Sequence, residues 1–450
     1  MPSTRTDRLP RHSGVLVLGG GVAGLAAALR LAEGGASVRL LEASDRLGGV
    51  VKTIRRDGFV ADVGPDVFLI RKPAALALAE RLGVETATPA SGALIQRRGK
   101  LHPLPAGLTG LVPGRLGPLL ATPALGLGAK LRAALEPMVP ARRDDADETL
   151  EAFAVRRFGR GAWEGLIEPL LGGLYGADLP ISLRATLPHL HASEVRGGFL
   201  KLRGPAASST SPFARPVDGM DALTDALAHA VRQHDVIIET GSPVAAVTAS
   251  GARLVDGTER LADAVLVALP APAAASVFAD LDPALVAPFN DIPMGTATAV
   301  VVGFPSAGLA VPDASGWLVP RAEGGPVQAV TMLSRKHAGT APPDHDLARV
   351  FLRADIPDDP AALAAAVAHL GHHLGEVRPV FTAVQRWRAI QPRYTLGHPE
   401  RLAALDAALE AHPRLALAGA SLRGVGLPDV IANAQAAADT LLTALDSPDR

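Results

Sequence analysis

A glycine-rich run near the N-terminus is the segment of the sequence best suited to hold a phosphate-bearing ligand. The run covers residues 19–24, follows the apolar residues 15–18, and precedes a second apolar run that ends on Glu42. Glycines at this spacing let backbone N–H groups approach a pyrophosphate at a helix N-terminus, and an acid after the next strand accepts hydrogen bonds from a ribose. The pattern predicts a strand, turn, helix and strand that bind a dinucleotide; an ordinary tight turn is the alternative.

The composition limits the chemistry that the side chains can perform. The chain has no cysteine, which excludes disulfides, thiolate nucleophiles and iron–sulfur ligation, so any redox chemistry must come from a cofactor. Thirteen histidines are present without an HExxH motif, and the adjacent pair His372 and His373 is expected at the surface, with no metal bound. A net charge of -1 gives no electrostatic footprint for nucleic acid, so no nucleic-acid partner is expected.

The length predicts several domains in an α/β chain. A chain of 450 residues exceeds the size of one hydrophobic core, which favours about two or three domains. We expect a Rossmann-like dinucleotide-binding domain from residues 1–90, 215–285 and 400–450, and a mixed-sheet substrate domain from 91–102 and 286–399. Residues 103–214 are expected to form a helical insertion.

Residues 103–129 are rich in leucine and carry one charge, Arg115. Prolines and glycines interrupt this stretch and would break a helix that must satisfy its own backbone in lipid. Two interpretations stay open: short helices that line an apolar cavity, or helices that dip into one leaflet of a membrane. Because the first 13 residues are polar and do not resemble a secretory signal, we expect a cytoplasmic protein, either free or in peripheral contact with the inner face of the membrane.

A second strand, glycine turn and helix unit lies near the C-terminus. The short strand predicted over 414–419 leads through residues 424–428 into an amphipathic helix predicted over 429–445. Pro428 suits the first turn of that helix, where its missing N–H is not needed. The exposed N–H groups of such a helix start form a partial positive charge, which suits a second anionic part of the same ligand.

Further motifs resemble the flavin-dependent amine oxidase superfamily, and within it the protoporphyrinogen and coproporphyrinogen oxidases. The shared segments run in the same order over nearly the whole chain: 42–49 (EASDRLGG), 64–73 (GPDVFLIRKP), 167–175 (IEPLLGGLY), 183–188 (LRATLP), Gly219-Met220, Trp387, 394–398 (YTLGH) and 423–429 (RGVGLPD). Two departures, after Tyr175 and at Asp218, concern local loop shape. The resemblance implies FAD in place of NAD.

The resemblance also implies which residues contact FAD. The matching positions for diphosphate and adenosine are Gly19, Gly20, Gly21, Val22, Ala23, Gly24, Glu42, Ala43 and Val244; those for the turn and the isoalloxazine are Arg46, Gly48, Gly49, Gly64, Pro65, Asp66, Val67, Trp387, Val425, Gly426 and Leu427. For Trp387, plain core packing is an equal alternative. For the last three positions, a helix start beside the ring would stabilise the negative charge of reduced flavin.

The implied reaction is the six-electron oxidation of a porphyrinogen to a porphyrin in heme biosynthesis, by three hydride transfers to FAD. Dioxygen is the implied acceptor, and hydrogen peroxide is released. Because the reactive atoms belong to cofactor and substrate, no acid–base residue is predicted. Further implied partners are a ferrochelatase that takes over the product and a second copy of the chain in a homodimer.

Cations must meet the carboxylate arms of such a substrate. Arg71 and Lys72 match a basic pair of the bacterial coproporphyrinogen-type members, although a solvated pair before a helix is an equal interpretation. Arg184, Arg196, Arg203 and Arg393 are weaker candidates, each expected at the surface. The pair favours coproporphyrinogen III over protoporphyrinogen IX. Other possibilities are a carotenoid desaturase or amine oxidase, and a non-catalytic carrier of the GDP-dissociation-inhibitor type.

Overall fold

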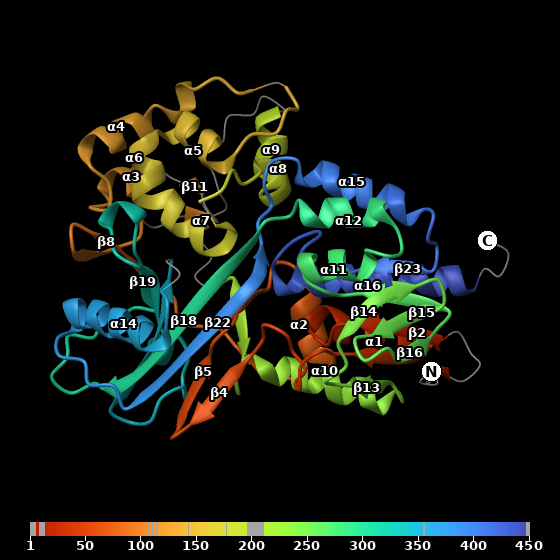
Figure 1. Cartoon of the computed structure of the whole chain (residues 1–450). Coiled ribbons are helices and arrows are strands. Elements are labelled where there is room, and N and C mark those ends of the chain that lie inside the picture. The colour runs from red at the N-terminus through yellow and green to blue at the C-terminus, as the bar shows by residue number, and fades with distance from the viewer. Residues whose placement is uncertain are drawn as a thin grey trace.

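A computed structural model describes residues 6–8, 14–105, 108–109, 112–113, 116–142, 144–176, 178–195, 211–353 and 356–446. Two large sheets organise this part of the chain, with one group of helices beside them (Figure 1). The parallel sheet and its helices lie to the right in Figure 1, and the second sheet runs diagonally to the left beneath the helices α3 to α9. The predicted α/β class, with a Rossmann-like parallel sheet and a mixed sheet, is confirmed.

The first sheet has five parallel strands. Their order is β13 (Ile237–Glu239), β3 (Ser37–Leu41), β2 (Gly14–Leu18), β17 (Ala264–Val267) and β23 (Leu415–Leu417). The central strand β2 is buried on both faces, as its apolar run predicts. Val15 and Val17 face one core, while Leu16 and Leu18 face the other, because side chains alternate along a strand.

Helices cover both faces of the parallel sheet. The core of Val15 and Val17 contains α1 (Val22–Glu33), α2 (Ala74–Arg81), α10 (Asp221–Gln233) and α16 (Leu427–Leu445). The core of Leu16 and Leu18 contains α11 (Ala271–Phe278), α12 (Pro283–Asn290) and α15 (His398–Leu409). Helices therefore cover both faces of the sheet, and loops follow the ends of its strands.

Smaller sheets connect these parts. A four-stranded sheet has the order β1 (Thr6–Arg8), β16 (Glu259–Leu261), β15 (Gly251–Leu254) and β14 (Val244–Thr248). A three-stranded sheet has the order β6 (Phe68–Leu69), β12 (Phe213–Pro216) and β7 (Thr86–Ala87). Two pairs complete the set: β4 (Thr53–Arg56) with β5 (Phe59–Asp62), and β10 (Leu108–Thr109) with β11 (Val112–Pro113).

The second large sheet has seven strands. Their order is β22 (Phe381–Pro392), β18 (Met294–Pro305), β21 (His345–Leu352), β20 (Val327–Met332), β19 (Gly316–Leu318), β8 (Ala93–Arg97) and β9 (Lys100–Pro103). Neighbours are antiparallel except β19 and β8. On one face, α14 (Asp359–Leu374) packs against Val300 and Val302; on the other, Val301 packs against Phe59 of the β4–β5 hairpin.

The region between β9 and β12 is mainly helical. Its elements are α3 (Leu116–Ala121), α4 (Leu127–Ala134), η1 (Glu136–Met138), α5 (Leu150–Phe158), α6 (Arg160–Ala162), the π-helix η2 (Trp163–Ile167), α7 (Glu168–Tyr175), α8 (Leu183–Thr186) and α9 (Pro188–Val195). They share a core around Phe153, Phe158 and Trp163. In the described residues no helix is long and apolar enough to cross a membrane. The exact limits of the three predicted domains stay predictions.

Three histidines and a tryptophan meet where α14 packs on β19. Trp317 Nε1 donates to His369 Nε2 at 3.1 Å, and the ring centroids of His369 and His373 lie 5.1 Å apart. The surface prediction for the histidine pair is therefore wrong for His373, which is half-buried, while His372 is exposed. Burial lowers the pKa of His369 to about 4, and His373 and His372 add to the shift.

Because His369 is neutral when folded, it should make the protein sensitive to mild acid. The unfolded chain takes up a proton near pH 6.5 and the folded chain near 4, so stability falls as the pH drops through this window. His369→Gln keeps an acceptor for Trp317 and removes the titration. In urea unfolding, the loss of stability between pH 7 and pH 4 should shrink by about 1–2 kcal/mol in this variant, after allowance for partial exposure. An unchanged loss would contradict this assignment.

Candidate cofactor and substrate site

Both glycine turns start helices at the same edge of the parallel sheet. Helix α1 follows β2 and α16 follows β23, and these strands are parallel to each other through β17. The two helices pack side by side, joined by the Arg30–Asp439 ion pair at 2.7 Å (Figure 1). Neither Gly21 nor Gly426, the residues that precede these helices, has a side-chain cap. The edge therefore presents two helix starts whose N–H groups are available to an anion.

The glycines of the first turn serve different purposes. A Cβ on Gly24 would lie 1.8 Å from the Gly19 carbonyl oxygen, and one on Gly20 would lie 2.6 Å from Leu47 Cδ2. These two positions need glycine because protein atoms pack directly against them. The nearest atom to a Cβ on Gly21 is Gly49 Cα at 3.9 Å, so this position faces open space. Gly21 is therefore the glycine that leaves room for a ligand.

Glu42 already makes hydrogen bonds at the end of β3. Its Oε2 accepts from the Gly20 N–H at 2.6 Å, and its Oε1 accepts from the N–H and hydroxyl of Ser44 at 2.9 and 2.7 Å. The Ser242 N–H donates to the Glu42 carbonyl at 2.8 Å, which brings the start of β14, with Val244, to the same end of the sheet. Ala43 is exposed beside them. The structure thus gathers the residues predicted for the adenosine; their contacts with it stay predictions.

Arg46 shapes the loop that covers the first turn. Its guanidinium donates to the carbonyls of Leu47 and Val51 at 3.1 Å each, and to that of Gly49. Gly48 has a φ of 99°, and its N–H donates to the Gly20 carbonyl at 2.8 Å. Arg46 therefore holds the backbone of the RLGG segment, and a direct contact between its side chain and the dinucleotide stays a prediction.

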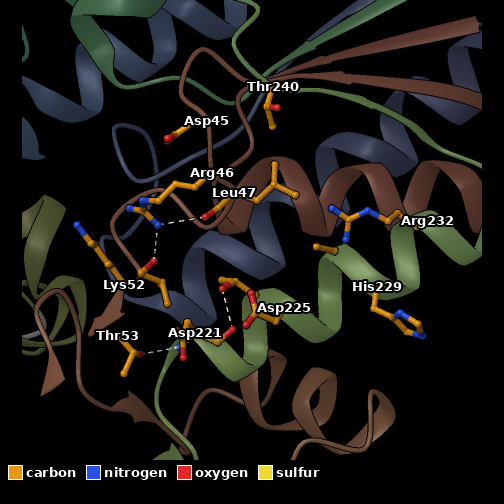
Figure 2. A pocket seen from close by; sticks show the side chains of 13 residues that line it. Asp45, Arg46, Leu47, Lys52, Thr53, Asp221, Asp225, His229, Arg232 and Thr240 are labelled. Carbon is orange, nitrogen blue, oxygen red and sulfur yellow. Dashed lines mark hydrogen bonds between the residues drawn. The ribbon is translucent and has the colours of Figure 1, made fainter. Parts of the chain in front are cut away.

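On its other side the same loop borders an open groove of about 700 Å³ against α10 (Figure 2). Charged side chains line the groove, among them Arg46, Lys52, Asp221, Asp225 and Arg232. Figure 2 shows α10 forming one wall and the loop with Arg46 the other. Apart from Arg46, none of the residues predicted to contact FAD lines it. The groove is therefore separate from the edge where the two helices start.

Residues 63–67 connect the chain just after the RLGG segment to the seven-stranded sheet. Arg349 donates to the carbonyls of Asp62 and Gly64 at 2.7 Å each, and Trp387 Nε1 donates to the Val63 carbonyl at 2.9 Å. A Cβ on Gly64 would lie 1.9 Å from the Val50 carbonyl oxygen, which is why this position is glycine. Pro65 and Val67 are half-buried. Trp387 thus has a structural contact; its place beside a flavin ring stays a prediction.

The Asp66 carboxylate is buried beside two cations and a histidine. It contacts Lys336 Nζ at 2.7 Å, Arg349 at 2.9 Å and His337 Nε2 at 3.2 Å. Burial alone would raise the pKa of Asp66, but Arg349, Lys336 and His337 together hold it well below its usual range. The side chain therefore fixes residues 63–67 on the sheet. Sequence reasoning missed all three partners, because no local motif connects them to Asp66.

Two aromatic side chains hold the second glycine turn. Tyr394 donates its hydroxyl to the Ala420 carbonyl at 2.5 Å, and His398 Nε2 lies 2.8 Å from the Leu422 carbonyl oxygen. The two rings stack with centroids 4.0 Å apart. Val425, Gly426 and Leu427 follow this support, half-buried at the start of α16. Tyr394 and His398 lay within a matching motif, yet the sequence did not reveal that they support this turn.

Lys72 reaches the same turn from the loop before α2. Its Nζ contacts the two carboxylate oxygens of Asp429, in the first turn of α16, at 2.7 and 2.8 Å. Burial raises the pKa of Tyr175, and the charge of Asp429 adds to the shift. Burial also lowers the pKa of His189, with Arg71 and Lys72 contributing. The structure thus brings the predicted pair Arg71 and Lys72 together with Asp429, Tyr175 and His189.

The four arginines that were weaker candidates for the carboxylate arms differ in burial and in pairing. Arg184 is half-buried and pairs with Glu400 of α15, and Arg196 and Arg203 lie outside the described residues. Arg393 is buried, with 9% of its surface exposed, so its surface prediction is wrong. It is enclosed because α7, far away in the sequence, covers the end of β22.

The fold and the site define an α/β dinucleotide-binding protein with a second, mixed sheet beside the ligand edge. The chain belongs to the flavin containing amine oxidoreductase family, whose pattern matches residues 22–442. It is 36% identical to the coproporphyrinogen III oxidase of Propionibacterium freudenreichii over 96% of this chain and 91% of that protein. It is 31% identical to the coproporphyrinogen III oxidase of Bacillus subtilis (96% and 98%).

A solved structure has the same architecture. The protein from Exiguobacterium sp. 255-15, described as a protoporphyrinogen oxidase, superimposes with a TM-score of 0.85 at 28% identity, over 96% of this chain and 99% of that one. The TM-score shows that the two proteins share one overall fold.

The residues at the ligand edge fit the FAD of this family. Gly21 leaves space at one helix start, and the uncapped start of α16 offers N–H groups at another. When bound, FAD supplies the hydride-accepting chemistry that these side chains lack. The two helix starts would hold it, since their partial positive charges suit an anionic group such as the diphosphate.

Gly21→Val should separate cofactor binding from folding. The residue has φ -72° and ψ -179°, which valine adopts freely, and the nearest protein atom to a Cβ is 3.9 Å away. We expect a folded protein with a near-normal melting temperature that binds FAD at least about tenfold more weakly, measured by flavin absorbance after desalting. In the control Gly24→Ala, the contact with Gly19 should lower stability by about 1–3 kcal/mol. A Gly21→Val protein that retains FAD would refute this assignment.

Proposed function

We propose that this chain is an FAD-dependent oxidase that converts coproporphyrinogen III to coproporphyrin III in heme biosynthesis, with dioxygen as the acceptor. The observation that carries the proposal is the likeness over 96% of the chain to proteins named coproporphyrinogen III oxidase. A protoporphyrinogen substrate is the second candidate, since a tobacco protoporphyrinogen oxidase is 27% identical over 52% of the chain. The shorter and weaker likeness places it second.

The proposed reaction is a six-electron oxidation in three hydride-transfer rounds, with hydrogen peroxide released. Its demands on the protein are orientation and the exclusion of water, because the reacting atoms belong to cofactor and substrate. The side chains around the second glycine turn match these demands. Burial raises the pKa of both Tyr175 and Tyr394, which marks this region as poorly accessible to water, and Tyr394 donates its hydroxyl to the Ala420 carbonyl.

Arg71 and Lys72 are the proposed ligands of one carboxylate arm. An ammonium group has three N–H donors, and the contacts with Asp429 use two of them, so one is left for a substrate. Asp429 holds Lys72 at the start of α16, one of the two helix starts proposed for FAD, and this position supports the proposed role of the cation. His189 adds a neutral ring to the same cluster.

The decisive experiment is aerobic turnover of coproporphyrinogen III and protoporphyrinogen IX by the FAD-loaded protein. Porphyrin fluorescence and peroxide release are followed together, and the mechanism requires three equivalents of peroxide for each porphyrin. We expect a higher kcat/KM for coproporphyrinogen III. If neither porphyrinogen is oxidised, the proposed function fails; if protoporphyrinogen IX is preferred, the second candidate replaces the first.

Lys72→Ala should raise KM for coproporphyrinogen III by about five- to tenfold, since one charge-assisted hydrogen bond is lost. KM for protoporphyrinogen IX should change less, because it has fewer carboxylates to place. Lys72→Arg should recover part of the loss, and Lys100→Ala, an exposed lysine on β9, serves as the control. Equal effects of Lys72→Ala on both substrates would remove Lys72 from this role.

We also propose peripheral membrane contact through α4 and η1. Leu127, Leu131 and Leu135 lie on one face of this segment at helical spacing and are 74%, 59% and 51% exposed; Met138 is 79% exposed. Hand-over of product to a ferrochelatase, a homodimer and a cytoplasmic location remain parts of this proposal.

Leu131→Glu with Leu135→Glu should reduce co-sedimentation with phosphatidylglycerol vesicles at least about threefold, since charged residues do not enter the apolar boundary. Val255→Glu, which alters another exposed apolar residue, is the control. Equal sedimentation of both variants and the wild type would exclude this face.

A further inference from the structure

Arg393 occupies a position where a charged side chain is unexpected. It follows β22 directly, and only 9% of its surface is exposed. Its guanidinium lies between two glycines: a Cβ on Gly176, at the end of α7, would lie 1.6 Å from Nη1, and one on Gly295, in β18, would lie 2.5 Å from Nε. Three elements therefore enclose the group, and a Cβ at either glycine would force the guanidinium to shift.

The guanidinium has no hydrogen bond or ion pair to any of the described residues. Its Nη1 is fully covered and unpartnered. Burial lowers the pKa of Arg393; Asp178 opposes this shift, while Arg321 adds to it. Asp178, however, is paired with Arg321 at 3.7 Å and lies beyond ion-pair distance from Arg393. A buried charge without a partner destabilises a fold, so such a group is expected where it meets an anion from outside the chain.

The position of Arg393 connects it to the cluster around Lys72. Gly176, which touches the guanidinium, follows Tyr175, and the Gln391 side chain of β22 donates to the Gly173 carbonyl of α7 at 3.2 Å. Burial raises the pKa of Tyr175, and the charge of Asp429 adds to this shift. Asp429 in turn pairs with Lys72. Tyr394, next to Arg393, holds the second glycine turn. Arg393 thus lies in the wall formed by α7, β18 and β22 beside the proposed substrate site.

We propose that Arg393 binds a carboxylate arm of the tetrapyrrole, at a point in this wall separate from Arg71 and Lys72. The inference rests on the proposed function and deepens it. Nε and Nη2, which lie beside Gly295, are not among the fully covered unpartnered atoms of the described residues, and they form the guanidinium edge that binds a carboxylate through two hydrogen bonds. A tetracarboxylate has arms on all sides of its ring, so it meets both cationic points at once. Arg393 therefore favours coproporphyrinogen over a dicarboxylate substrate.

The test measures binding of the porphyrin products to the FAD-loaded protein, without turnover. Coproporphyrin III is the tetracarboxylate probe and protoporphyrin IX the dicarboxylate probe, both followed by fluorescence. Arg393→Gln should weaken coproporphyrin III binding about tenfold or more and reduce its salt dependence, and should change protoporphyrin IX binding less. Arg393→Lys should keep part of the affinity. Arg321→Gln, which removes a neighbouring but paired and half-exposed arginine, is the control.

The melting temperature distinguishes a carboxylate-binding role of Arg393 from a structural role. Removing an unpaired buried charge should leave the melting temperature of Arg393→Gln unchanged or raise it, whereas loss of a structural cation would lower it. Unchanged coproporphyrin III binding, or an equal loss for both porphyrins, would overturn the inference. If the wild type oxidises neither porphyrinogen but Arg393→Gln still loses coproporphyrin III selectively, the proposed function fails and the carboxylate site stands.

Discussion

Two buried carboxylates, Asp62 and Asp66, each pair with side chains from distant segments, and the rest of the structure depends on these contacts. Asp62 accepts from Arg215 at 2.7 Å and from the Met220 N–H at 2.9 Å, just before α10. Asp66 is held by Arg349, Lys336 and His337 on the seven-stranded sheet and the segment after β20. Unpaired, either charge would strongly destabilise the fold, so the short segment between them must bind both halves of the molecule. This segment lies beside the predicted flavin ring, and the same ion pairs fix its backbone.

The two helix starts lie at one edge of the sheet because the strands before them are parallel. Strands β2 and β23 lie in one sheet on either side of β17, and each is followed by a helix that returns along the same face. The helix starts therefore fall at one edge, although more than four hundred residues separate Gly21 from Gly426 (Figure 1). Different contacts hold the two glycine turns in place. Close glycine packing around Gly24 holds the first, whereas the second depends on Tyr394 and His398 from the segment that links β22 to α15.

The cations near the proposed substrate site differ in whether the chain itself satisfies them. Lys72 is paired with Asp429 and Arg321 with Glu168, so these groups help to hold the wall in place. Arg393 is enclosed by α7 and β18, and within the part of the chain that the structure describes it has no such partner. Sites that bind a charged ligand often retain a group that weakens the free protein, because the ligand provides the missing partner. The wall therefore combines paired cations, which help to fix its shape, with Arg393, whose charge we propose a ligand neutralises.

The sequence by itself determined the elements whose signals are local. Glycine spacing, the acid after β3 and the apolar runs predicted the first βαβ unit, and the C-terminal turn and helix were found in the same way, because backbone approach and strand alternation depend on neighbouring residues. Only the tertiary structure decided the partners of single side chains. It placed Asp66 among Lys336, Arg349 and His337, enclosed Arg393, and turned His373 toward Trp317. Burial and ion pairing at these positions arise from segments hundreds of residues apart or from packing between layers, and no local pattern records which charge will meet a partner.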